Sequence, residues 1–208
     1  RVISIDYRLA PEHPFPAGVE DGVRAFRCVA RRAREFDIDP TRIAVMGDSA
    51  GGNLSAVVAH KTKGDSLRPA LQVLIYPAVD GSCAMKSQQT FGEGWILTSS
   101  KIEWFYHVYV GDDQAVRLQP DVSPLFAENF QGLPPALVYT AGFDPLRDEG
   151  MAYAARLEKE GIPVRHHCFT SLTHGFAAMG PVCPTAQDAA RQMAHEVSRA
   201  LYDGFLAT

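Results

Sequence analysis

The stretch that decides the fold is Gly47-Asp48-Ser49-Ala50-Gly51-Gly52. It follows a short apolar run at residues 43–46 and precedes a segment rich in alanine and valine at residues 53–61. The run predicts a β-strand, and the segment predicts an α-helix. Because glycines flank Ser49, backbone can pass close to it, so the stretch predicts a tight, strained turn from strand to helix.

Apolar runs and helical patterns alternate on both sides of this turn. Strands are predicted at residues 2–6, 43–46, 71–76, 136–140 and 164–169, and helices at residues 18–35, 53–61, 96–110, 145–159 and 184–201. The run 71–76 is almost continuously apolar, which is typical of a central parallel strand covered on both faces. The alternation predicts the α/β class, with a mainly parallel sheet and helices on both faces.

Residues 81–133 interrupt the alternation. They are rich in glycine, serine, glutamine and aromatic residues, among them Phe91, Trp95 and Trp104. We interpret them as an excursion from the sheet that contributes to a cap or a pocket wall. A satellite hydrophobic core is the alternative, and the two interpretations are compatible.

The composition excludes several classes of binding partner. The 208 residues carry a formal net charge of −4, and the one basic cluster, residues 31–34, fits the end of a helix. Nucleic-acid surfaces need clustered lysine and arginine, so none is expected. No apolar run is long enough to span a bilayer. The four cysteines lack metal-ligand spacing, so we expect no metal site. We expect the cysteines to be free thiols, which favour a cytoplasmic location, although a disulfide stays open.

Ser49 fits the pattern G-x-S-x-G between a strand and a helix. Such a turn exposes the serine oxygen above the sheet edge as a nucleophile. The helix that begins at Ala50 points N–H groups toward the same place, where they favour developing negative charge, so the Ala50 N–H is a predicted oxyanion-hole donor. The alternative is an ordinary serine in a tight turn.

A serine nucleophile needs a base and a group that orients it. His174 is the candidate base, because it alone of the seven histidines lies in a loop after a late strand, before a glycine. Asp144 follows a predicted strand and would accept the imidazole Nδ1–H, in the chain order Ser…Asp…His. Asp148 and Glu149, in the first turn of the next helix, are competitors that we interpret as structural, and Asp80 is a weaker rival.

Four motifs closely resemble the hormone-sensitive-lipase family of bacterial esterases. They are Tyr7-Arg8-Leu9-Ala10-Pro11-Glu12-His13-Pro14-Phe15-Pro16-Ala17, the stretch 47–54, Asp144-Pro145-Leu146-Arg147-Asp148-Glu149-Gly150 and His174-Gly175-Phe176. The resemblance covers essentially the whole chain. It implies an α/β-hydrolase fold, esterase activity on short acyl chains, the triad Ser49–His174–Asp144, no cofactor, and a homodimer paired through residues 164–169.

One departure from this family matters. Its members carry an HGGG motif upstream of Tyr7 that supplies the rest of the oxyanion hole, and this motif is absent here. The strand before HGGG lies between the strands expected at residues 2–6 and 43–46. Residues 1–208 are therefore expected to be a partial α/β-hydrolase domain, lacking N-terminal strands and part of the cap. An upstream segment of the same protein, another chain, or unusual packing would then fill the gap.

The sequence therefore predicts a carboxylic-ester hydrolase that acts on a small-molecule ester through an acyl-enzyme intermediate. Two alternatives stay open. One is an inactive or weakly active fragment with an incomplete oxyanion hole. The other is a small-ligand binding module on the same fold, which the presence of His174 disfavours.

Overall fold

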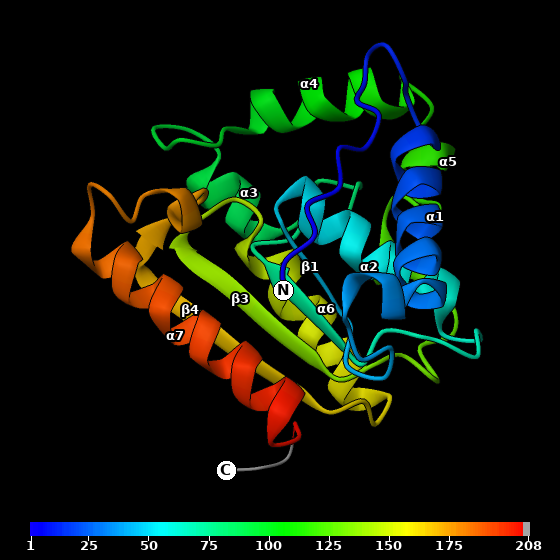
Figure 1. Cartoon of the computed structure of the whole chain (residues 1–208). Helices are drawn as coiled ribbons and strands as arrows, with labels where there is room; N and C mark the ends of the chain where they lie inside the picture. Colours follow the sequence, from blue (N-terminus) through cyan, green and yellow to red (C-terminus); the bar gives the residue numbers. More distant parts are fainter. Residues whose placement is uncertain (206–208) are drawn as a thin grey trace.

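Four parallel strands form the central sheet in the order β1-β2-β3-β4, as a computed structural model that describes residues 1–205 shows (Figure 1). The strands are β1 Ala44–Asp48, β2 Leu71–Ile75, β3 Ala136–Phe143 and β4 Val164–Thr173. The α-helices are α1 Ala17–Arg31, α2 Ala50–Thr62, α3 Lys86–Phe91, α4 Ser99–Val110, α5 Gln114–Arg117, α6 Arg147–Lys159 and α7 Pro184–Tyr202. Short 3-10 turns lie at Ala33–Phe36, Pro124–Phe126 and Phe176–Ala178. The predicted α/β class is confirmed.

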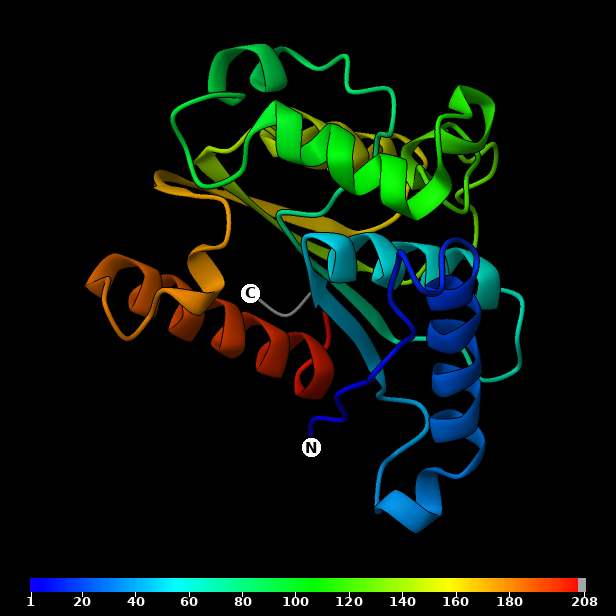
Figure 2. The ribbon, with the colours of Figure 1, turned by 90° about the horizontal axis from the view of Figure 1, so that it is seen from above.

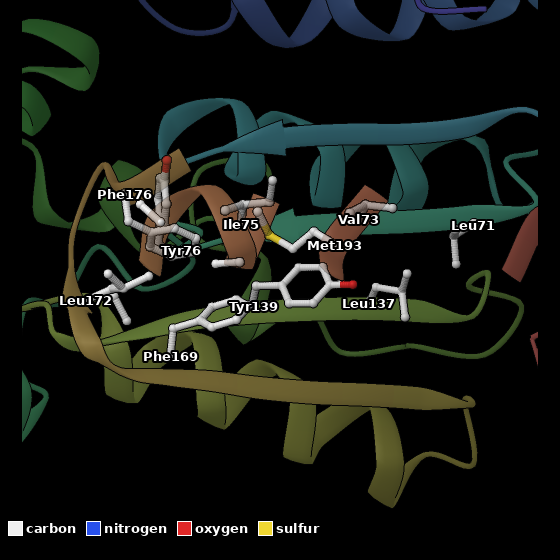
Figure 3. Packing of buried hydrophobic residues seen from close by; sticks show 13 residues of the cluster. Leu71, Val73, Ile75, Tyr76, Leu137, Tyr139, Phe169, Leu172, Phe176 and Met193 are labelled. Atoms are coloured by element: carbon white, nitrogen blue, oxygen red, sulfur yellow. The ribbon is translucent and has the colours of Figure 1, made fainter. Parts of the chain in front are cut away.

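Both faces of the sheet are buried, and alternate residues of each strand serve different faces. Val73 and Tyr139 point toward α7, where they pack with Phe176 and Met193 (Figure 3). On the opposite face, Leu74 packs in a cluster that contains residues of α2 and α6. All five residues of β2 are buried, which explains its almost continuous apolar sequence.

The segment between β2 and β3 carries α3, α4 and α5 and forms a layer outside the sheet (Figures 1 and 2). Ile102 and Tyr106 of α4 pack against Leu146, which precedes α6 and follows the carboxyl end of β3. This layer therefore packs against the connection between β3 and α6. Its predicted role in a cap or pocket wall stays a prediction.

The strand predicted at residues 2–6 is wrong. This segment runs in extended coil in front of β1 and joins no sheet, and Val2 is 97% exposed. A strand needs a neighbour to pair its N–H and C=O groups, and the described residues place none beside it. The following stretch is fixed instead by Arg8, whose guanidinium donates two hydrogen bonds to Asp21 of α1, at 2.8 and 2.9 Å.

An open edge of the sheet faces residues 1–5. β1 pairs with β2 on one side, and no strand among residues 1–205 pairs with its other side. Between this edge and residues 1–5 lies a groove of about 800 Å³ that reaches Ser49 and Ala50. The sheet formed by residues 1–205 therefore has no internal gap and ends at the open edge of β1, and a segment that pairs with this edge stays a prediction.

Two further expectations concern the whole chain. All four cysteines, which lie within the described residues, are free thiols. Within residues 1–205, none of the helices combines the length and the apolar character that crossing a bilayer requires.

The buried His60 of α2 generates a prediction about acid stability. Its Nε2 lies 3.1 Å from the Tyr153 hydroxyl, and its ring meets the edge of Phe130. Burial, assisted by the charges of Lys63 and Arg156, lowers the pKa of His60 from 6.5 to about 4. The folded state keeps this imidazole neutral, whereas the unfolded chain protonates it as the pH falls below 6.5.

Between pH 6.5 and pH 4 the unfolded chain therefore binds the extra proton, and stability falls as the pH falls. We expect this group to remove about 1–2 kcal/mol of unfolding free energy between pH 7 and pH 5. Urea unfolding of the wild type and of His60→Gln at both pH values measures it. The variant should lose less stability on acidification, and equal losses in both proteins would contradict the prediction.

Candidate active site

Ser49 lies in a strained turn at the carboxyl end of β1. Its backbone has φ 53° and ψ −117°, a conformation that a non-glycine residue adopts only when its surroundings impose it. Its N–H donates to the Ile75 carbonyl at 2.9 Å, and its carbonyl accepts from Asn53 N–H at 3.0 Å. The predicted tight, strained turn is thus present, and hydrogen bonds tie it to β2 on one side and to α2 on the other.

Two glycines allow this turn to close. A Cβ on Gly47 would overlap the carbonyl group of Gly51, and a Cβ on Gly52 would lie 2.9 Å from Pro77. By contrast, a Cβ on Gly51 would meet nothing within 4 Å. Strand and helix therefore approach so closely at residues 47 and 52 that only glycine fits.

A β-bulge brings Asp144 and His174 together. Ala141 of β3 faces Phe169 of β4, whereas Phe143 faces Thr173, so β4 contains two more residues than β3 over this interval. Gly142 makes the irregularity possible, because a Cβ there would overlap the carbonyl of Thr170. The bulge sets the residue after Phe143 beside the residue after Thr173.

The three predicted side chains form one hydrogen-bonded chain. His174 Nδ1 lies 2.8 Å from Asp144 Oδ2, and His174 Nε2 lies 2.9 Å from Ser49 Oγ. A carboxylate only accepts hydrogen bonds, so Nδ1–H donates to Asp144 and Nε2 of the neutral ring accepts from the serine hydroxyl. Asp144 is completely buried and also accepts the Leu146 N–H at 2.8 Å, which fixes its orientation.

The structure separates Asp144 from its competitors. Asp148 accepts the Ser87 N–H and pairs with Arg147, and Asp80 accepts the Ser82 N–H. Glu149 accepts backbone N–H groups of the chain after β2. No hydrogen bond joins any of these three carboxylates to His174. Ala50, the predicted oxyanion donor, is the first residue of α2, where the N–H groups have no acceptor within the helix.

Tyr76, directly after β2, also contacts the site, and the sequence did not single it out. Its ring centroid lies 4.7 Å from that of His174, and its hydroxyl donates to Asp48 at 3.2 Å. Burial, together with the negative charge of Asp48, raises the pKa of the Tyr76 hydroxyl, which therefore stays protonated. The only sequence signal is an aromatic residue between a buried strand and Pro77.

Aromatic side chains pack around Phe143, the residue before Asp144. Trp95 stacks on Phe143 with centroids 4.6 Å apart, and Phe91 meets the same ring edge-on at 5.9 Å. Arg147 lies over Phe91, 5.0 Å from its centroid. Two aromatic residues of the excursion thus pack against the residue that precedes Asp144.

The part of the chain that the structure describes contains no cluster of metal-ligating side chains. Across residues 1–205, no three histidine, cysteine, aspartate or glutamate side chains are grouped so as to hold a metal ion.

The glycine contacts generate a prediction with a matched control. Gly47→Ala forces a methyl group onto the Gly51 carbonyl, so the turn must open and move Ser49 away from His174. We expect a loss of several kcal/mol of stability, as for other severe steric conflicts, or no folded protein at all. Gly51→Ala meets open space inside a helix and should be neutral or slightly stabilising. Thermal unfolding of both variants measures this, and equal melting temperatures would contradict it.

Comparison with known proteins agrees with this geometry. Residues 1–178 match a family described as having the alpha/beta hydrolase fold. The chain is 49% identical over 183 residues to the carboxylic ester hydrolase LipN of Mycobacterium tuberculosis and 39% identical over 189 residues to an ethyl acetate hydrolase of Pseudomonas putida. These matches cover 85% and 90% of this chain but only 48% and 59% of the relatives.

Solved structures give the same result. A hyperthermophilic esterase from Pyrobaculum calidifontis superposes with a TM-score of 0.89 at 41% identity, over 94% of this chain and 65% of the esterase. The chain thus spans about half to two thirds of the length of its relatives. The resemblance drawn from the four motifs is confirmed, and this chain belongs to the α/β-hydrolase family.

Proposed function

We propose that this chain carries the catalytic residues of a serine esterase, which hydrolyses small carboxylic esters through an acyl-enzyme intermediate. The observation that carries the proposal is the pair of hydrogen bonds made by His174, to Ser49 at 2.9 Å and to Asp144 at 2.8 Å. The names of the relatives, a carboxylic ester hydrolase and an ethyl acetate hydrolase, point to the same reaction and to a short acyl group.

In the proposed mechanism, His174 Nε2 accepts the proton as Ser49 Oγ attacks the ester carbonyl. Asp144 stabilises the imidazolium that forms and holds its ring in place. The Ala50 N–H donates to the carbonyl oxygen as it becomes negative. His174 then gives its proton to the leaving alcohol, and a water molecule activated by the same imidazole releases the acid and regenerates Ser49.

A non-catalytic binding module finds less support. Such a module does not need a neutral imidazole aligned between a serine hydroxyl and a buried carboxylate. That alignment costs free energy, because Asp144 is completely removed from solvent. The positioned base therefore favours catalysis over binding alone.

Three substitutions test the proposal in the gene product that contains this chain. Ser49→Ala, His174→Gln and Asp144→Asn should each lower kcat on p-nitrophenyl acetate by about 1000-fold or more, because the three groups act as one unit. His195→Gln and Asp188→Asn, at exposed positions of α7, are the matched controls and should retain full activity. Full activity of Ser49→Ala would refute the proposal.

We further propose that an upstream segment of the same protein adds a strand to the free edge of β1 and completes the oxyanion hole. The support is the groove beside this edge, which reaches Ser49 and Ala50, and the exposed Met46 on β1. An edge strand with unpaired N–H and C=O groups is a template for another strand. A chain without that segment would bind the transition state less well, by about 2.7–4 kcal/mol for each missing donor.

Amide hydrogen exchange tests this second proposal. The N–H groups of β1 that point away from β2 should exchange fast in residues 1–208 alone and slowly in a longer gene product. The amides of β2, which is paired on both sides, serve as the internal control. Equal exchange of β1 in both proteins would contradict the added strand. Pairing of two copies through β4 and a cytoplasmic location stay predictions.

A further inference from the structure

Glu149 is a completely buried acid that the proposed mechanism does not use. It lies in the first turn of α6, five positions after Asp144. Buried carboxylates are costly unless their oxygens are hydrogen-bonded, so the partners of Glu149 indicate what this acid contributes.

Its two carboxylate oxygens accept hydrogen bonds from two other segments of the chain. Oε1 accepts the N–H groups of Val79 and Asp80 at 2.7 and 3.2 Å, and Oε2 accepts from the Gln88 side chain of α3 at 3.3 Å. Val79 and Asp80 belong to the chain that leaves β2. We call residues 76–80 the bridge segment, because it contacts both the Ser49 turn and His174.

The bridge segment touches the serine turn and the histidine directly. The Ala78 N–H donates to the Ser49 carbonyl at 3.3 Å, and Asn53 of α2 donates to the Ala78 carbonyl at 2.7 Å. The Tyr76 ring lies against His174. Glu149 joins this segment to α6, and the Leu146 N–H just before that helix donates to the Asp144 carboxylate.

Close packing reinforces the same junction. A Cβ on Gly150, the residue after Glu149, would lie 2.8 Å from Thr140 Cγ2 and 3.5 Å from Pro77. The start of α6 therefore sits directly on β3 and on the bridge segment. Movement of one of these elements must move the others.

We infer that Glu149 is a positioning residue: by accepting the Val79 and Asp80 N–H groups, it fixes the Ser49 turn relative to the Asp144–His174 pair. The inference rests on the proposed function. The proposed role depends on the position of the acceptor oxygen and not on a negative charge. Burial raises the pKa of Glu149 well above its usual value, the backbone donors act against this, and the negative charge of Asp80 adds to it. A neutral acceptor in the same place should therefore serve equally well.

Three variants separate positioning from charge and from simple filling of space. Glu149→Gln keeps an oxygen acceptor for both N–H groups, gives up only the 3.3 Å contact from the Gln88 side chain, and should retain at least half of the wild-type kcat. Glu149→Leu fills the space without accepting a hydrogen bond, and Glu149→Ala removes both space and acceptor. Both should lower kcat on p-nitrophenyl acetate by about 10-fold or more, expressed per natively folded molecule, while KM changes less than 3-fold. Glu158→Ala, at an exposed position of the same helix, is the control and should change neither value.

Each outcome bears on the inference. Rescue by glutamine together with loss in the leucine and alanine variants supports it. Wild-type kcat in folded Glu149→Leu overturns it, and so does a glutamine variant as slow as alanine. If the leucine and alanine variants do not fold while the glutamine variant works, Glu149 serves folding alone, and the positioning role is refuted. A wild-type protein without esterase activity would refute the proposed function itself, before any variant is compared.

Discussion

The imidazole of His174 must make two hydrogen bonds at once, and the rest of the site depends on this. One nitrogen faces a carboxylate that follows β3, and the other faces a serine that follows β1. These groups come from strands that are not neighbours in the sheet, with β2 between them. The parallel arrangement brings the carboxyl ends of the strands to one edge, and local irregularities then supply the last few ångströms.

These irregularities, the turn at Ser49 and the bulge before Asp144, depend on glycines that a larger residue could not replace without a steric clash. The turn at Ser49 closes because Gly47 and Gly52 lack a Cβ, and the bulge before Asp144 exists because Gly142 lacks one. The chain after β2 contacts the Ser49 turn through Ala78 and the His174 ring through Tyr76. Backbone packing thus brings the side chains of Ser49, Asp144 and His174 together.

The sequence predicted much of this from local patterns. The strands β1 to β4 and the helices α1, α2, α4, α6 and α7 follow the periodicity of their apolar residues, and Ser49, Asp144 and His174 follow their places after strands. The β3–β4 bulge had no clear local signal, because it depends on the register between distant segments. The strand expected at residues 2–6 failed for the same physical reason: strand propensity is realised only beside a partner. Tyr76 and Glu149 gain their roles from tertiary contacts that periodicity does not encode.

In the proposed mechanism, His174 activates the hydroxyl of Ser49. Treating the gene product with a fluorophosphonate ester and mapping the adduct by peptide mass spectrometry tests this activation most directly. We expect one phosphonyl group, on Ser49, formed rapidly in the wild type and at least about 100-fold more slowly in His174→Gln. A label on another serine, or equal labelling of Ser49 in the two proteins, would contradict it.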